Sequence, residues 1–158
     1  AFLLFSEESL GENTKKQLDM ARAYGVKISE LKNIEQITSY FTQTQENYLV
    51  VDAILGTGFR FPLSSFLFEV ITTVNTYASV TVSLDIPSGV VGDSGKISSS
   101  AIRADYTLAV GLPKLGHIMG SGSEVCGKIK VIDVGLPKIL LEEGDISLIT
   151  KDNVSFIK

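Results

Sequence analysis

Short apolar runs alternate along this chain with segments of helical periodicity, and no other feature of the sequence limits the possible folds as strongly. The clearest runs cover residues 48–55, 81–86, 106–110 and 129–134, and a segment with apolar residues at helical spacing covers residues 63–77. Strands that alternate with helices pair in parallel and are covered by helices on both faces of the sheet. The pattern predicts an α/β fold, a three-layer αβα sandwich with a mostly parallel sheet.

The N-terminal part of the chain predicts two further pairs of strand and helix. Residues 1–6 form an apolar run that is typical of a strand buried on both faces. A helix is predicted from a capping box at Thr14 to a stop at Gly25. A short strand over residues 26–28 and a second helix with Ser29 as its N-cap follow.

Composition excludes several classes of protein. The chain has 158 residues, enough for one domain, and no stretch approaches the roughly 20 apolar residues of a membrane span. Its net charge is −4 and its Lys and Arg residues are scattered, so it lacks the basic stripe that binds nucleic acid. The single cysteine, Cys126, rules out an internal disulfide and favours the cytoplasm, with an organelle left open.

A polar motif lies at the end of the apolar run over residues 48–55, at the sheet edge where open α/β folds bind ligands. Asp52 interrupts the run, and Gly56 and Gly58 allow backbone N–H groups to approach a phosphate closely. A glycine turn that only joins strand to helix is an equally good interpretation, and no third glycine completes a dinucleotide fingerprint. A buried carboxylate is costly unless paired or coordinated, so Asp52 is either a cation ligand or a hydrogen-bond anchor.

Two more motifs carry groups suited to proton transfer or ligand binding. Asp85 ends the next run, where it could act as a buried acid or base or simply cap the following turn, which presents Ser88. Lys114 lies in a loop bounded by Gly and Pro, where it could meet a phosphate, meet a catalytic carboxylate or remain solvated. Asp52 and Ser88 offer oxygen, so any cation between them would be hard: potassium, magnesium or calcium.

Two other kinds of site find no support in the sequence. His117 is the only histidine and has no second ligand at a metal-binding spacing, so a zinc site is not predicted. The chain contains no Gly-x-Ser-x-Gly nucleophile elbow, which argues against a serine hydrolase. Ser88 is therefore better interpreted as an oxygen ligand than as a nucleophile.

Taken in order, four motifs resemble those of the YjeF N-terminal domain family. They are Asp52-Ala-Ile-Leu-Gly-Thr-Gly, Leu84-Asp-Ile-Pro-Ser-Gly, Ala104-Asp-Tyr-Thr with Pro113-Lys-Leu-Gly, and Val131-Ile-Asp-Val-Gly-Leu-Pro. The resemblance implies a Rossmann-like sandwich that interconverts the R and S epimers of NADHX and NADPHX, which are hydrated, damaged forms of NADH and NADPH. It also implies a homodimer and a partner dehydratase, fused or separate, that depends on ADP or ATP.

The resemblance also implies roles for individual residues. Asp52 and Ser88 would help to bind a potassium ion. Asp85 would contact the nicotinamide-derived ring and act as acid or base, and Lys114 would position the substrate or assist proton transfer. The substrate phosphates would be cradled by Gly56, Thr57, Gly58, Phe59, Arg60, Phe61 and Pro62.

The same resemblance shapes the expected domain organisation. Residues 1–158 would form one domain of this family, incomplete at its N-terminus, and residues after about 145 would lead toward a second domain. The family's Asn-Asn-Gly-Gly-Asp-Gly segment, which supplies a potassium ligand and phosphate contacts, would precede Ala1. The chain alone is therefore expected to be weakly active or inactive. The alternatives are a non-catalytic nucleotide-binding or protein-interaction module of the same fold and, less well supported, a methyltransferase or dehydrogenase.

Overall fold

The computed structural model describes residues 1–43, 47–97, 99–137 and 139. Along the chain lie β1 (Phe2–Leu3), the 3-10 helix η1 (Glu7–Ser9), α1 (Glu12–Ala23), β2 (Ser29–Glu30), α2 (Ile34–Gln43), β3 (Leu49–Asp52), α3 (Ser65–Tyr77), β4 (Val80–Leu84), β5 (Tyr106–Val110), the 3-10 helix η2 (Leu115–His117), α4 (Gly122–Val125) and β6 (Lys128–Ile132). Among these elements, no helix has the length and apolar character needed to cross a membrane. The second domain expected after about residue 145 lies outside the described residues.

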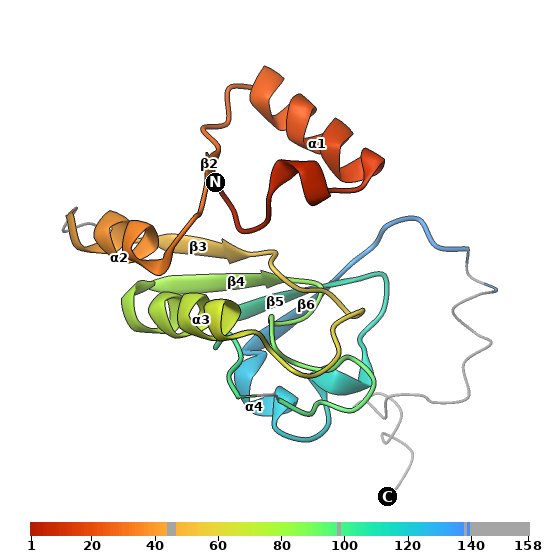
Figure 1. Cartoon of the computed structure of the whole chain (residues 1–158). Helices are drawn as coiled ribbons and strands as arrows, with labels where there is room; N and C mark the ends of the chain where they lie inside the picture. The colour runs from red at the N-terminus through yellow and green to blue at the C-terminus, as the bar shows by residue number, and fades with distance from the viewer. Residues whose placement is uncertain (44–46, 98, 138, 140–158) are drawn as a thin grey trace, which may run out of the picture.

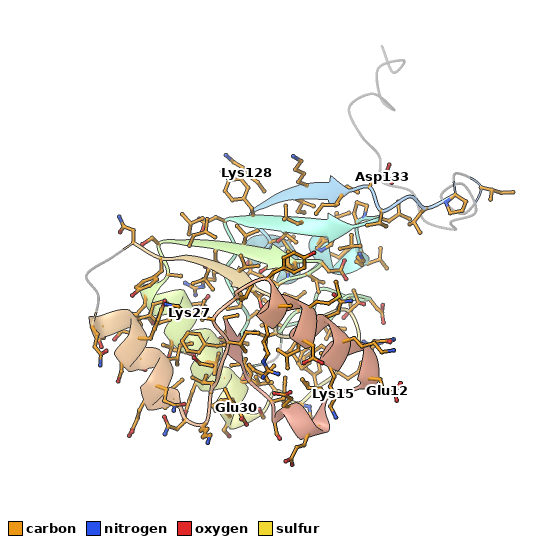
Figure 2. All side chains as sticks on the ribbon, turned by 90° about the horizontal axis from the view of Figure 1, so that it is seen from above. Glu12, Lys15, Lys27, Glu30, Lys128 and Asp133 are labelled. Carbon is orange, nitrogen blue, oxygen red and sulfur yellow. The ribbon has the colours of Figure 1, made fainter. Side chains whose placement is uncertain are left out.

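Four parallel strands in the order β3-β4-β5-β6 form the main sheet (Figure 1). They coincide with the four apolar runs of the sequence, so the predicted parallel sheet is confirmed. In Figure 2 the sheet is seen from above, with Lys128 at the start of β6 and Asp133 just past its end. Asp52 ends β3, and the residues that follow β4 and β5 emerge at the same edge of the sheet, because all four strands point the same way.

Helices α2 and α3 lie together beside the main sheet, whereas α1 stands apart from it with β1 and β2 and has no buried residue (Figure 1). The helix α3 begins after Ser64, whose Oγ accepts a hydrogen bond from the backbone N–H of Leu67 at 3.3 Å. Its residues Val70 and Ile71 are buried in the main core with Ile37 and Phe41 of α2. This packing fixes the crossover from β3 to β4 and with it the positions of the loops that follow both strands.

The N-terminal strand differs from its prediction. Strand β1 pairs in parallel with β2 to form a separate two-stranded sheet, and Phe2 and Phe5 are 37% and 46% exposed rather than buried. An apolar cavity of about 680 Å³, lined by residues 1–5 and by residues 48–51 of the β3 region, separates this small sheet from the main one. The prediction of a strand buried on both faces is therefore wrong, because neither β1 nor the helix that follows it, α1, has a buried residue.

The predicted helix boundaries in this region were partly wrong. Helix α1 starts one turn earlier than the capping box at Thr14 suggested, because the N–H of Lys15 already bonds to the carbonyl of Gly11 at 3.0 Å. Gly25 does end the helix and has a φ of +79°, a conformation that glycine adopts without steric cost. Ser29 lies in β2 and is not the cap of α2, since Asn33 supplies that hydrogen bond, to the N–H of Gln36 at 3.1 Å.

Candidate functional site

Asp52 and Ser88 meet directly at the carboxyl edge of the sheet, and both are almost fully buried, at 2% and 1% exposure. The Ser88 hydroxyl donates to Asp52 Oδ1 at 2.5 Å, and the Ser88 backbone N–H donates to Oδ2 at 2.9 Å. Pairing of β3 with β4 places Asp52 beside Ser83, whose hydroxyl donates to Oδ2 at 2.7 Å. The carboxylate thus anchors the turn after β4 to the end of β3, as one of the two interpretations of Asp52 predicted.

The same cluster offers a set of oxygen atoms that suits a cation. Ser88 Oγ lies 3.4 Å from the carbonyl oxygen of Leu55 and accepts a hydrogen bond from the Leu55 N–H at 2.9 Å. A carboxylate, a hydroxyl and a carbonyl oxygen therefore converge within one buried cluster. Among the described residues, no lysine, arginine or histidine forms an ion pair with Asp52. The buried negative charge is held by hydrogen bonds alone, so the donor chemistry fits a hard, singly charged cation.

The turn that follows β3 is open to solvent. A Cβ added at Gly56 or Gly58 would meet no atom within 4 Å, and neither glycine has a positive φ. Arg60 fixes the turn by donating to the carbonyl of Thr57 at 2.9 Å and by pairing with Asp93 at 3.1 Å. Because neither packing nor backbone conformation requires these glycines, the bare backbone is accessible to a ligand such as a phosphate.

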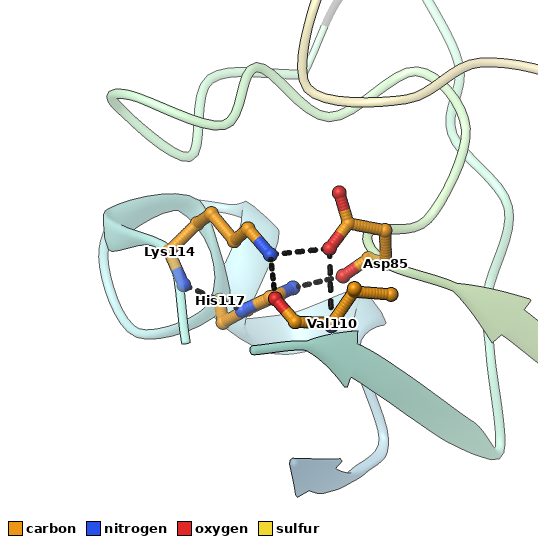
Figure 3. A network of polar contacts seen from close by, with 4 residues as sticks. All are labelled: Asp85, Val110, Lys114 and His117. Carbon is orange, nitrogen blue, oxygen red and sulfur yellow. Dashed lines mark hydrogen bonds and ion pairs between the residues drawn. The ribbon is translucent and has the colours of Figure 1, made fainter. Parts of the chain in front are cut away.

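Asp85 and Lys114 form a half-buried ion pair in which each side chain is 25% exposed (Figure 3). Lys114 Nζ contacts Asp85 Oδ1 and also donates to the carbonyl of Val110 at 2.8 Å. The Val110 N–H donates to the same carboxylate oxygen at 3.2 Å. Of the alternatives left open by the sequence, Lys114 contacts the carboxylate. Asp85 Oδ2 accepts no hydrogen bond from any residue that the structure describes, and it points away from the network.

His117 belongs to this cluster, although the sequence predicted no role for it. It is 1% exposed, and its Nδ1 accepts a hydrogen bond from the backbone N–H of Lys114 at 2.9 Å. Its Nε2 lies 2.7 Å from the backbone carbonyl oxygen of Asp85. Burial lowers the pKa of His117 below its ordinary value, which favours the neutral ring. The only feature of the sequence that pointed to His117 was its position three residues after Lys114.

The candidate residues thus form two clusters and one turn, joined by the short segment from Asp85 to Ser88. Asp52 and Ser88 make the buried cluster, Asp85 and Lys114 the half-exposed one, and the turn after β3 carries the exposed glycines. The apolar cavity near residues 1–5 is not part of this arrangement, because none of the residues in the two clusters lines it. A buried oxygen cluster beside an accessible acid and lysine is suited to nucleotide binding and proton transfer.

Comparison with a solved structure supports the fold of the chain. The crystal structure of the yeast protein ynu0 superposes with a TM-score of 0.61 over 73% of this chain and 47% of the yeast chain. The two sequences are 21% identical, so this similarity concerns the fold alone. It agrees with the Rossmann-like α/β architecture predicted from the sequence.

Two curated relatives are more similar in sequence. The bifunctional NAD(P)H-hydrate repair enzyme Nnr of Thermofilum pendens is 35% identical over 153 residues, which cover 97% of this chain and 29% of the relative. The NAD(P)H-hydrate epimerase of Elusimicrobium minutum is 34% identical over 125 residues, which cover 79% of this chain and 56% of the relative. The chain therefore spans about half, or less, of the length of these relatives.

The family comparison covers most of the chain. The sequence model described as YjeF-related protein N-terminus matches residues 1–116, a range that includes Asp52, Asp85, Ser88 and Lys114. The ordered motifs that suggested this family therefore lie mainly within the matched range. This chain belongs to the family described as YjeF-related protein N-terminus.

Proposed function

We propose that this chain takes part in the epimerisation of the R and S forms of NADHX and NADPHX, as an isomerase in nicotinamide nucleotide repair. The observation that carries the proposal is the Asp85–Lys114 ion pair at the carboxyl edge of the sheet, in which the second carboxylate oxygen accepts no hydrogen bond from the described residues. The names of the relatives, NAD(P)H-hydrate epimerase and NAD(P)H-hydrate repair enzyme, support the same activity.

In this proposal Asp85 exchanges the proton with the substrate, and Lys114 holds the Asp85 carboxylate in place. Epimerisation leaves the composition of the substrate unchanged, so a proton that is removed from the substrate must be replaced by another. A carboxylate can do both, as a base and then as an acid, if it is held within hydrogen-bond reach of the substrate. The positive charge of Lys114 balances the negative charge of Asp85, and its contact with Oδ1 fixes the carboxylate.

The turn after β3 would hold the phosphates of the substrate. Its exposed backbone at Gly56 and Gly58 leaves room for phosphate oxygens, and Arg60, which is paired with Asp93 in the structure, lies in the same turn. The nearby residues of this turn, namely Thr57, Phe59, Phe61 and Pro62, would complete the surface around the nucleotide.

Replacing Gly58 by alanine tests this role of the turn. We expect the melting temperature to remain unchanged, because the added Cβ meets no atom within 4 Å. The KM for NADPHX should rise about tenfold, equivalent to roughly 1.4 kcal/mol, because the methyl group occupies the space next to the phosphates. Thermal melts and steady-state kinetics measure the two effects. An unchanged KM would remove the turn from the binding site.

A potassium ion is proposed to bind between Asp52 and Ser88, with the Leu55 carbonyl as a third oxygen. The donor set has a single negative charge, which suits a monovalent cation better than a divalent one. When bound, the ion would supply positive charge next to the phosphate-binding turn. The Ser88 hydroxyl would then have to turn its proton away from Asp52 Oδ1.

Thermal melts in potassium chloride and in choline chloride of equal ionic strength test this site without any activity assay. We expect potassium to raise the melting temperature of the protein, because a ligand that binds only the folded state stabilises it. The Ser88→Ala variant, compared with its own melt in choline chloride, should show no such rise. Equal melting temperatures of the unmodified protein in both salts would count against the cation.

The partners of the protein are part of the same proposal. A dehydratase, fused or separate, would consume the S epimer, as the bifunctional names of several relatives suggest. We also propose a homodimer that acts in the cytoplasm. Burial raises the pKa of the lone thiol of Cys126 to about 11, which suits a cysteine kept reduced.

The direct test is the conversion of R-NADPHX in potassium buffer, coupled to a dehydratase specific for the S epimer. Turnover that depends on the chain supports the epimerase. Thermal stabilisation by NADPHX without turnover would instead favour a nucleotide-binding module of the same fold.

A further inference from the structure

The imidazole of His117 connects the two residues of the proposed acid–base pair from below (Figure 3). Its Nδ1 accepts the backbone N–H of Lys114, so this nitrogen carries no proton in the structure. The proton of the neutral ring therefore lies on Nε2, which donates to the carbonyl oxygen of Asp85. One buried ring thus holds the backbone of both residues.

The backbone of Asp85 needs such support. Its φ is +66°, and among the described residues it is the only one other than glycine with a positive φ. This left-handed conformation is strained for a residue with a Cβ and persists where surrounding contacts determine it. The Asp85 N–H donates to the Leu108 carbonyl at 2.9 Å, and His117 takes the Asp85 carbonyl, so both backbone polar groups are held.

The fixed backbone of Asp85 determines what each of its two carboxylate oxygens contacts. With the backbone fixed, Oδ1 accepts hydrogen bonds from the Val110 N–H and from Lys114 Nζ. Oδ2 accepts none from the described residues, and the side chain is 25% exposed. The network therefore makes the two oxygens of one carboxylate unequal: one is occupied by the protein and one is available to a ligand.

We propose that His117 is the positioning residue of this site: its neutral ring holds Asp85 in the left-handed conformation, so that Oδ2 is the oxygen that exchanges the proton with the substrate. The proposal rests on the proposed epimerase function and extends it to a residue that does not touch the substrate. The contact from Nε2 to Asp85 is the one that matters most, because it acts on the strained residue itself.

Two amide side chains separate the two contacts of the ring. In His117→Gln the amide nitrogen reaches the place of Nε2 and can still donate to the Asp85 carbonyl. In His117→Asn the amide oxygen reaches the place of Nδ1 and can still accept the Lys114 N–H, whereas the contact to Asp85 is lost. The two variants carry the same functional group and form a matched pair.

We expect His117→Gln to keep kcat within about threefold of the unmodified chain, and His117→Asn to lower kcat by about 10- to 100-fold with little change in KM. Both are measured at pH 8, where the imidazole of the unmodified chain is neutral. Urea unfolding of each variant serves as the control for folding. Equal kcat values for the two variants, whether both keep the rate or both lose it, would overturn the proposal.

A second measurement does not depend on the epimerase. The carboxyl carbon of Asp85 can be titrated by ¹³C NMR in the unmodified chain and in both variants. A titration curve preserved in His117→Gln and displaced in His117→Asn supports the positioning role even where no turnover is found. Identical curves in all three proteins would overturn it, and a lack of turnover in a protein that carries the complete family domain would count against the proposed function alone.

Discussion

Replacing Asp85 by asparagine is expected to lower the kcat for NADPHX epimerisation by about 10²- to 10⁴-fold, the range that general acid–base groups contribute. Asparagine has the same shape as aspartate and can still accept hydrogen bonds from the Val110 N–H and from Lys114 Nζ. It cannot take up and return a proton at neutral pH. The loss should therefore appear in kcat, with KM nearly unchanged.

The measurement is the steady-state rate with R-NADPHX, coupled to an S-specific dehydratase. Asp19→Asn is a matched control, because Asp19 lies on α1 with its side chain 73% exposed and outside the candidate site. This control should keep its full rate and its melting temperature. If Asp85→Asn also kept its rate, Asp85 would have no part in proton transfer, and Lys114 would be the next candidate for that role.

The main sheet was predictable because its strands are apolar runs separated by turns and by segments of helical periodicity. Residues 106–110 were assigned to a strand with the same limits as β5, and the helix predicted over 63–77 corresponds to α3. Periodicity could not settle the N-terminal part, where residues 1–6 look like a buried strand. Burial there depends on which elements pack over the two faces of the strand, and a sequence pattern does not contain that information.

The sequence predicted which polar residues lie at the carboxyl edge of the sheet, but it did not predict their contacts. Asp52 and Asp85 stood out because each is polar at the end of an apolar run, and Ser88 because the following turn presents it; parallel topology brings such ends together. The left-handed backbone of Asp85 and its support by His117 could not be read from the sequence. A lone histidine in the short 3-10 helix η2 belongs to no recognisable sequence motif, and its importance comes from the backbone groups that surround it.

Replacing Asp52 by alanine is expected to lower the free energy of unfolding by about 2 to 5 kcal/mol, the largest stability effect at the site. The substitution removes the acceptor of the Ser83 hydroxyl and of the Ser88 N–H, both of which are buried. Each buried donor left without a partner costs roughly 1–3 kcal/mol. The Ser88 hydroxyl has a second partner in the Leu55 carbonyl and adds less.

Urea unfolding at neutral pH, followed by circular dichroism, measures this loss. Ser83→Ala is the matched comparison, because it removes one hydrogen bond to the same carboxylate without leaving Asp52 unpaired, and it should cost about 1 kcal/mol. Once alanine stands at position 52, Ser83→Ala should cost almost nothing, which a double-mutant cycle would show. A variant Asp52→Ala that proved as stable as the unmodified protein would mean that the buried carboxylate gives no net stability. Its presence in a buried cluster of oxygen atoms would then be explained by cation binding alone, and the melts in potassium chloride would decide that point.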